Sequence, residues 1–326
     1  MRPAGRTAGR KLGEGSSQDL YLFGAFKYLN LAGRQVGLAT LSKRQVARSG
    51  HTRAAAAVPS KDKASTVTEK PSFALVTGAS QGLGRIFAIA LAARGQNVIL
   101  VARSRDKLEK LASELRQSQS VIAEVIEFDL ASPLAGPRLA QQVRDRNLQV
   151  NLLVNNAGFG VRGEFQTLTL QRQMEMVRLN NDAVVELTYS LLPLLMEHPQ
   201  AGIINVSSAA GFQPIPYASL YSATKSFLTN FSLGLQEELR STTVSVVTLC
   251  PGRLLADSHG GETKNGNRKF GFIYQAPEDV VREALESLAN GGGLVIPGFV
   301  NKLSVIAQRL IPRRAVPALV AKMSRQ

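Results

Sequence analysis

From Ser72 onward, short β-branched hydrophobic runs alternate with longer segments of helical periodicity. The seven runs that predict strands span residues 73–76, 97–101, 121–128, 152–155, 202–207, 244–250 and 293–297. The segments between them have a helix-forming composition, and in 104–117 the apolar positions Leu108, Leu111 and Leu115 recur on one helical face. Strands that alternate with helices pair in parallel through right-handed crossovers. We therefore expect one doubly wound α/β domain, with a seven-stranded parallel sheet flanked by helices.

The N-terminal part of the chain lies outside this pattern. Residues 1–70 hold 13 of the 39 basic side chains but only 4 of the 24 acidic ones, and their one compact apolar patch spans residues 20–31. Such a composition is typical of a transit peptide for a chloroplast or mitochondrion. A disordered basic tail, or upstream sequence wrongly joined to the gene, has the same composition; without targeting, we expect a cytoplasmic protein. The chain then divides into a basic leader (1–70), the α/β domain (71–300) and a basic tail (301–326).

The C-terminal tail is also basic. Residues 301–326 carry six basic side chains, no acidic one, and apolar positions that predict two short amphipathic helices broken at Pro312 and Pro317. Such helices could lie on an anionic membrane surface or on an acidic acyl carrier. The simpler interpretation is that they cover the sheet edge or join the subunits of a homo-oligomer.

Composition excludes several classes of protein. An apolar content of 44% with 19% charged residues is that of a globular protein, not of a disordered chain. One cysteine, Cys250, and three histidines argue against a disulfide scaffold and a cysteine/histidine zinc site, so we expect no metal. The net charge of +15 could indicate nucleic acid, but residues 71–326 balance 26 basic against 20 acidic side chains and have no concentrated basic-aromatic face. We therefore expect no nucleic-acid partner.

A glycine-rich loop follows the first predicted strand. The sequence TGASQGLG (77–84) places Gly78, Gly82 and Gly84 between that strand and a helix from about Arg85. Glycines there let the backbone approach a pyrophosphate and offer it the free N–H groups of the helix. The Gly-x3-Gly-x-Gly spacing alone is a weak signal, because three glycines can also make a tight turn. Its position in the first βα unit nevertheless favours a dinucleotide site.

The end of the second strand indicates which dinucleotide binds. A carboxylate there would bind the ribose 2′-hydroxyl and repel a 2′-phosphate, but this chain has Arg103 and no acid before Asp106. Because Arg103 can offer a phosphate a planar and permanently charged fork, we predict NADP(H) as the cofactor. The alternative is that Arg103 is a solvated residue at a helix start. Asp129 closes the third strand and could accept a hydrogen bond from the adenine amino group.

Three residues could carry acid/base chemistry. Tyr221 and Lys225 are four residues apart in a segment with helical composition, so both should face one way. A free tyrosine has a pKa near 10, but a neighbouring ammonium and the positive charge of an oxidised nicotinamide would lower that pKa. Ser208 ends the fifth strand at the same edge and could hydrogen-bond a substrate oxygen. A lone Tyr-x3-Lys is common and means little by itself.

Taken together, these motifs resemble the short-chain dehydrogenase/reductase family over about residues 71–300. The residues that carry the resemblance are Thr77–Gly84, Asn155–Gly158, Asn180, Ser208, Tyr221, Lys225 and Pro251-Gly252, in the order and spacing of that family. More narrowly, LVNNAGFG and the run from FQPIPYASLYSATKSFL to LCPG resemble a bacterial-type group of largely unassigned oxidoreductases. The resemblance of the chain to steroid reductases and to very-long-chain 3-oxoacyl reductases is more distant. The threonine that usually follows Pro-Gly is missing around Ala256.

The resemblance implies a single Rossmann-like domain and a role for each matching residue. Tyr221 would be the acid/base, Lys225 would bind the nicotinamide ribose, Ser208 would polarise the carbonyl, and Asn180 would hold a water of a proton relay. Asn181, beside Asn180, leaves a one-residue ambiguity, which the spacing from the preceding hydrophobics resolves in favour of Asn180. The cofactor contacts implied are Gly78, Ser80, Gly82, Leu83, Gly84, Arg103, Asp129, Leu130, Asn156, Ala157, Gly158, Tyr221, Lys225, Pro251 and Gly252.

The substrate is less well defined by the sequence. Phe159, Phe212, Ile215 and Tyr217 could line an apolar pocket, and the polar, glycine-rich segment 253–275 is a candidate lid. We therefore predict an NADPH-dependent oxidoreductase that interconverts a carbonyl and an alcohol on a small lipophilic ketone or aldehyde. The alternatives are a 3-oxoacyl thioester reductase of fatty-acid metabolism and a non-catalytic nucleotide-binding interaction protein on the same fold.

Overall fold

A computed structural model describes residues 70–255, 274–308, 310–312 and 314–324. The predicted leader, except Lys70, and most of the predicted lid (256–273) lie outside the described residues.

The strands form one parallel sheet in the predicted number. Seven strands pair in the order β3-β2-β1-β4-β5-β6-β9, and every pairing is parallel. Their bounds are β1 (Ser72–Thr77), β2 (Asn97–Ala102), β3 (Ala123–Glu127), β4 (Gln149–Asn155), β5 (Ala201–Val206), β6 (Val244–Leu249) and β9 (Gly293–Val295). β3 begins two residues later than the hydrophobic run predicts, because Ser120 takes a left-handed conformation (φ 54°) that ends the preceding helix, and residues 121–122 link the two elements.

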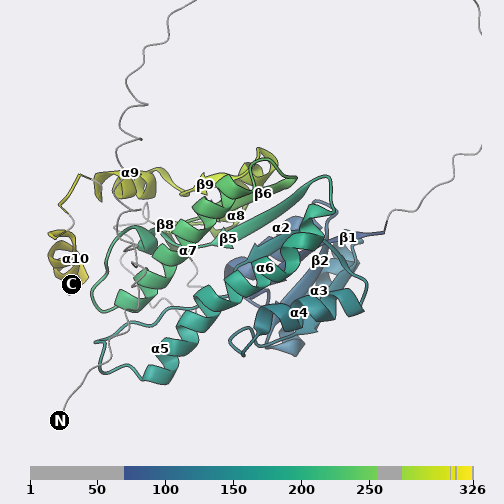
Figure 1. Ribbon diagram of the computed structural model, residues 1–326, viewed down its shortest axis with the longest axis horizontal. Helices are drawn as coiled ribbons and strands as arrows, with labels where there is room; N and C mark the ends of the chain where they lie inside the picture. Colours follow the sequence, from purple (N-terminus) through teal and green to yellow (C-terminus); the bar gives the residue numbers. More distant parts are fainter. Residues whose placement is uncertain (1–69, 256–273, 309, 313, 325–326) are drawn as a thin grey trace, which may run out of the picture. The chain divides into compact units, whose positions relative to one another are not determined.

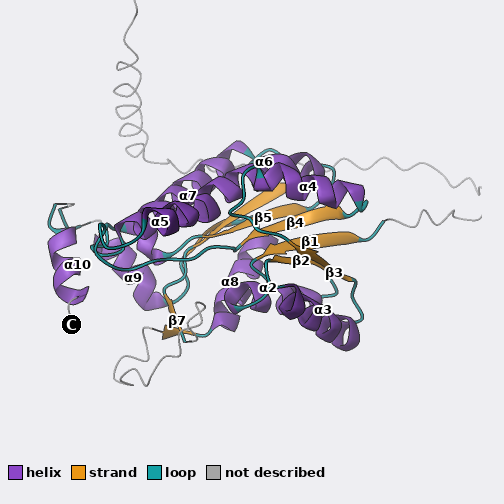
Figure 2. Cartoon of the chain, turned by 90° about the horizontal axis from the view of Figure 1, so that it is seen from below, coloured by secondary structure: helices purple, strands orange, loops and turns teal. Residues whose placement is uncertain are grey.

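Helices cover both faces of the sheet, which confirms the doubly wound architecture. On one face lie α2 (Gly82–Ala92), α3 (Arg105–Gln119) and α8 (Pro277–Ala289), and on the other α4 (Ala135–Asp145), α6 (Ala183–Met196) and α7 (Ser219–Glu238), as Figure 2 shows. Strand residues alternate between two cores: Ala74 and Val76 pack with α2, while Phe73 and Leu75 pack with α4 and α6. Both faces of the strands are therefore buried, as their continuous apolar runs predict.

The sheet order places a crevice beside β1. The chain runs outward from β1 through β2 to β3, then crosses to β4 on the other side of β1. Ligands of open α/β sheets bind outside the carboxyl ends of the strands at such a switch point. The loops that follow the first six strands in sequence, β1 to β6, lie at this edge, and they carry most of the predicted site residues.

Smaller elements complete the domain at the same edge. Between β4 and α6 lie α5 (Leu170–Val177) and the π-helical η1 (Arg178–Asp182), and between β5 and α7 lies the short 3-10 helix η2 (Ala209–Phe212). β7 (Arg253–Leu254) and β8 (Tyr274–Gln275) form a separate two-stranded pair.

The tail forms two helices, as predicted: α9 (Phe299–Gln308) and α10 (Val316–Ser324). Pro317 does not break α10 but occupies its first turn, where the missing N–H costs no helical hydrogen bond. Within the part of the chain that the structure describes, no helix combines the length and apolarity needed to span a bilayer.

Candidate active site

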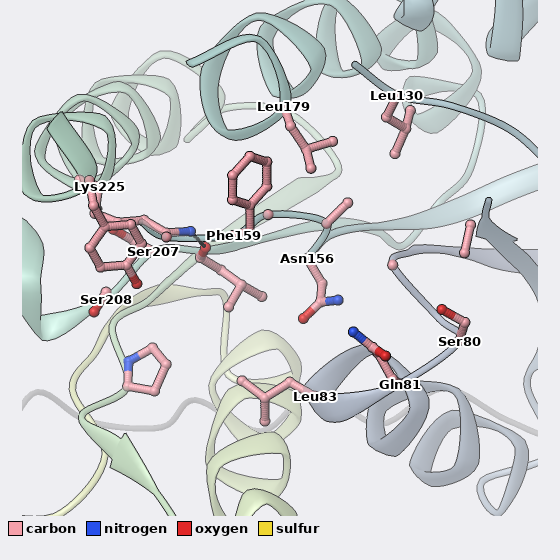
Figure 3. A pocket seen from close by; sticks show the side chains of 18 of the residues that line it. Ser80, Gln81, Leu83, Leu130, Asn156, Phe159, Leu179, Ser207, Ser208 and Lys225 are labelled. Carbon is pink, nitrogen blue, oxygen red and sulfur yellow. Dashed lines mark hydrogen bonds between the residues drawn. The ribbon is translucent and has the colours of Figure 1, made fainter. Parts of the chain in front are cut away.

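A pocket of about 590 Å³ runs along the carboxyl edge of the sheet, from the end of β2 to the first turns of α7 (Figure 3). The predicted cofactor residues that line it are Gly78, Ser80, Leu83, Arg103, Asp129, Leu130, Asn156, Ala157, Gly158, Tyr221, Lys225, Pro251 and Gly252. Ser208 lines the same pocket. The structure therefore brings together in one cavity residues that are far apart in the sequence.

Two of the predicted glycines act behind the pocket wall. Gly84 lies in α2, and a Cβ atom there would overlap the carbonyl oxygen of Gly78, so this glycine lets the helix approach the loop. Gly82 begins α2 with a left-handed φ of 55°. Neither lines the pocket. That they contact the cofactor stays a prediction; in the structure they shape the loop that presents Gly78, Ser80 and Leu83.

Thr77 ties the end of β1 to the end of β4. Its Oγ1 donates to the carbonyl oxygen of Val154 at 3.0 Å and accepts from the N–H groups of Asn156 at 2.9 Å and Ala157 at 3.0 Å. The side chain of Asn156 donates in turn to the carbonyl oxygen of Thr77 at 2.8 Å. These bonds fix the wall formed by Asn156, Ala157 and Gly158 against the glycine loop.

Tyr221, Ser208 and Lys225 meet where η2 faces the start of α7. The Tyr221 phenol and the Ser208 hydroxyl share a hydrogen bond. Lys225, which lies one helical turn beyond Tyr221, is buried, and its Nζ donates to the carbonyl oxygen of Val206 at 2.9 Å. Ser207, the neighbour of Ser208, turns away and donates to the carbonyl oxygen of Lys225 at 2.8 Å. Of the two serines, Ser208 is thus the one that contacts the phenol.

Burial controls the acidity of this group of side chains. It raises the pKa of the Tyr221 phenol above its ordinary value, and the hydrogen bond with Ser208 opposes the shift. Burial also lowers the pKa of the Lys225 ammonium to about 8. The neighbouring Cys250 has a smaller effect in the opposite direction. The sequence predicts a lowered pKa for Tyr221, but the protein without cofactor does not produce it, because the effect of burial on the pKa is larger than that of the hydrogen bond with Ser208. A phenol that keeps its proton near neutral pH is suited to proton donation.

Asn180 is buried inside η1 and joins two parts of the site. Its Nδ2 donates to the carbonyl oxygen of Phe159 at 2.9 Å and to Oγ1 of Thr224 at 3.1 Å. Asn181 instead donates to the carbonyl oxygen of Thr224 at 2.9 Å. Asn180 is thus the one that faces the wall after β4, although it does not itself line the pocket. Single π-helical turns inside longer helices are frequent at functional sites.

The far end of the pocket is basic. Arg103 has a side chain that is 65% exposed, and its Nη1 lies 3.5 Å from the Glu175 carboxylate of α5. Glu175 also contacts Arg172 at 2.7 Å, and the Arg172 guanidinium stacks 3.8 Å from the centre of the Phe159 ring. Arg172 lines the pocket but is not predicted from the sequence, because an arginine on an amphipathic helix resembles any solvated charge.

The predicted apolar substrate pocket divides in two. Phe159 lines the pocket described above, whereas Phe212 and Ile215 line a separate cavity of about 1090 Å³ between α7 and the tail helices. Tyr217 lines neither, and its backbone takes a left-handed φ of 65° in the loop before α7. The four residues therefore do not form one surface. The reason is that η2 turns Phe212 and Ile215 away from Tyr221, toward the outer side of α7.

Comparison with known proteins agrees with this geometry. Residues 72–266 match a family model described as short chain dehydrogenase. Two similar proteins are very-long-chain 3-oxoacyl-CoA reductases. The Homo sapiens protein is 33% identical over 183 residues, 55% of this chain and 58% of its own length; the Anas platyrhynchos protein is 34% identical over 236 residues, 68% of this chain and 71% of its own. The chain thus spans less than two thirds of the human reductase.

Solved structures share the fold. A 7beta-hydroxysteroid dehydrogenase superposes with a TM-score of 0.70 at 25% identity, over 77% of this chain and 96% of that one. A short-chain dehydrogenase from Sphingobium yanoikuyae in complex with NADPH gives a TM-score of 0.64 at 27% identity, over 74% and 94%. Since the family model matches more than half of the chain, and the sheet order and the placement of Tyr221 at its carboxyl edge agree with it, the chain belongs to the short-chain dehydrogenase family.

Proposed function

We propose that the protein is an NADPH-dependent oxidoreductase that interconverts a carbonyl group and an alcohol. The observation that carries the proposal is the joint position of Tyr221, Ser208 and Lys225 in one pocket with a basic far end. A proton donor, a second hydrogen-bond donor and a buried cation at one place fit a reaction in which a carbonyl oxygen gains negative charge and then a proton.

The pocket fits a nicotinamide dinucleotide phosphate. Among the described residues, its lining includes three arginines, Arg103, Arg172 and Arg253, and a single carboxylate, Asp129. α2 starts at the pocket, and no side chain caps its first turn, so its N–H groups can bind a pyrophosphate. Gly78, with a left-handed φ of 66°, and Ser80 would hold that pyrophosphate, Arg103 the 2′-phosphate, and Lys225 the nicotinamide ribose.

The chemistry divides between the cofactor and the protein. When bound, the reduced nicotinamide supplies the two electrons and the hydrogen that reduce the carbonyl carbon. Ser208 donates a hydrogen bond to the carbonyl oxygen and so draws electron density from the carbon. Tyr221 then gives its phenolic proton to the same oxygen, which leaves an alcohol, and the Lys225 ammonium stabilises the phenolate until solvent restores the proton. In the reverse direction Tyr221 would act as the base.

For the substrate we propose a lipophilic carbonyl compound, and the relatives favour one class. Two similar proteins bear the name very-long-chain 3-oxoacyl-CoA reductase, which supports a 3-oxoacyl thioester as the substrate. The second class of candidate substrates is ketones and aldehydes without a thioester. This class includes steroid ketones, because one of the similar structures is a 7beta-hydroxysteroid dehydrogenase.

The test is the variant Tyr221→Phe, assayed by NADPH absorbance over ketones, aldehydes, steroids and 3-oxoacyl thioesters. Loss of the general acid should lower kcat by about 10²- to 10⁴-fold. The Kd for NADPH should change little, because the ring still packs in its place. Tyr189→Phe, at a position on α6 that is 81% exposed, is the matched control and should leave both values unchanged.

Two results would contradict the proposal in different ways. Undiminished turnover by Tyr221→Phe would remove Tyr221 from the mechanism. A wild-type protein that binds NADPH but oxidises it with no compound of the panel would favour the non-catalytic alternative, a nucleotide-binding interaction protein.

A further inference from the structure

The outer face of α9 is apolar where a surface helix is ordinarily polar. Phe299, Leu303 and Ile306 are 79%, 54% and 58% exposed, and Leu310, just beyond the helix, is 84% exposed. The spacing of four and three residues places Phe299, Leu303 and Ile306 in one line along the helix, whereas Leu310 borders the cavity between the tail and α7. We call Phe299, Leu303 and Ile306 the α9 stripe.

The opposite side of α9 already has its partners. Val305 is 4% exposed, and Val305 and Gln308 line the cavity between the tail and the first two turns of α7. Asn301 donates from Nδ2 to the carbonyl oxygen of Pro297 at 3.1 Å. Because Val305 and Gln308 pack α9 against the domain, the α9 stripe, on the opposite side of the helix, faces outward. Figure 1 shows α9 itself at the margin of the domain.

The charge around the stripe has one sign. From residue 299 to the end of the sequence there are six basic side chains and no acidic one. Of these, Lys302, Arg314 and Lys322 are exposed on the described part of the tail. A second copy of the chain is a poor partner for this surface, since two such tails would bring like charges together at their contact.

We propose that α9 docks on an anionic lipid surface, with the α9 stripe at the boundary of the acyl chains and the basic side chains toward the headgroups. A helix that has a wide apolar face flanked by Lys and Arg lies in the plane of a membrane interface in this way. Apolar burial and attraction to anionic lipid then act together. The inference is independent of the catalytic proposal, because no residue of the α9 stripe lines the candidate active site.

The first test is co-sedimentation of the full chain with vesicles of phosphatidylcholine and phosphatidylserine, against vesicles of phosphatidylcholine alone. We expect pelleting with the mixed vesicles and little without phosphatidylserine. The double variant Leu303→Ser/Ile306→Ser should partition at least about tenfold more weakly, because two apolar side chains no longer leave water. Ile122→Ser is the matched control: Ile122 is 45% exposed beside the start of β3, far from the tail in the sequence.

The second test reports on the stripe alone, because the basic leader could also attract the full chain to anionic vesicles. The chain has no tryptophan, so Leu303→Trp introduces a single fluorescent reporter. Its emission should shift to shorter wavelength on the mixed vesicles and be quenched by brominated lipid, whereas that of Ile122→Trp should not change. Equal pelleting of the double variant together with an unshifted Leu303→Trp would overturn the proposal. The proposal would also be overturned if the double variant Leu303→Ser/Ile306→Ser converted a dimer to a monomer while its binding to the vesicles stayed the same as that of the wild type.

Discussion

Asn180 holds both polar groups of the Phe159 backbone. Its Nδ2 donates to the carbonyl oxygen of Phe159 at 2.9 Å, and its Oδ1 accepts from the N–H of the same residue at 3.1 Å. An amide side chain can donate from one atom and accept at the other without carrying a charge. Because Nδ2 also donates to Thr224 on α7, the wall after β4 and the helix that carries Tyr221 share one support.

Asn180→Asp should therefore weaken both the fold and the site. The substitution removes the donor and places a carboxylate against a carbonyl oxygen in a position that is 1% exposed. We expect a loss of about 1–3 kcal/mol in the free energy of unfolding, measured in urea, and a lower kcat/KM. Asn230→Asp, at an exposed position of α7, is the control. Equal stability of the two variants would refute the supporting role of Asn180.

The sequence predicts the choice of Asn180 but not the reason for it. Spacing from the preceding hydrophobics favours Asn180 over Asn181, and the two side chains have different partners, since Asn180 donates to Phe159 whereas Asn181 donates to the backbone of α7. Nothing in the local composition indicates that residues 178–182 form a π-helical turn. That turn depends on packing between η1 and α7, and such packing is a tertiary effect that periodicity alone does not report.

The sheet and the pocket floor are predicted well because each depends on local pattern. Continuous apolar runs predict the strands, and the glycine-rich loop at 77–84 predicts the part of the pocket that follows β1. At the basic end of the pocket Arg103 is predicted but Arg172 is not, since the two are 69 residues apart and only the path of α5 brings Arg172 and Glu175 to the end of β2. The predicted apolar pocket is wrong for a similar reason: the direction in which η2 turns Phe212 cannot be derived from its hydrophobicity.

Lys225 should make the stability of the fold depend on pH. Burial lowers its pKa from 10.5 to about 8, so between these values the unfolded chain holds a proton that the folded chain does not. The stability of the wild type should rise with pH across that window. Relative to Lys225→Met, which carries no charge, the wild type should gain about 3 kcal/mol between pH ~7 and pH ~10.5 in guanidinium unfolding without cofactor.

The control for this prediction is Lys107→Met, an exposed lysine of α3. Its difference from the wild type should be nearly the same at both pH values. A pH-independent difference for Lys225→Met as well would show that the ammonium is solvated and that its pKa is not lowered.

Two glycines in helices should respond in opposite ways to the same added methyl group. A Cβ atom on Gly136 of α4 would overlap the backbone of Glu186 on α6, whereas one on Gly234 of α7 would meet no atom within 4 Å. We expect Gly136→Ala to cost about 1–3 kcal/mol through overpacking. Gly234→Ala should be neutral or stabilise by up to about 1 kcal/mol, because alanine favours a helix. Thermal unfolding of the two variants checks both signs, and similar shifts in Tm would contradict the close packing of α4 on α6.

The ion pair between Arg103 and Glu175 should oppose the binding of NADPH. Glu175 lies 3.5 Å from Arg103 and 2.7 Å from Arg172, so it competes with a 2′-phosphate for the arginine at the end of β2. Arg103→Ala should raise the Kd for NADPH about 10- to 100-fold and leave that for NADH nearly unchanged. Glu175→Gln should lower the Kd for NADPH by up to about fivefold, the range expected for an exposed pair. The matched control is Glu109→Gln, because Glu109 pairs with Arg105 at the same 3.5 Å outside the pocket. If Glu109→Gln and Glu175→Gln tighten NADPH binding equally, the effect is one of net charge and Glu175 has no specific role.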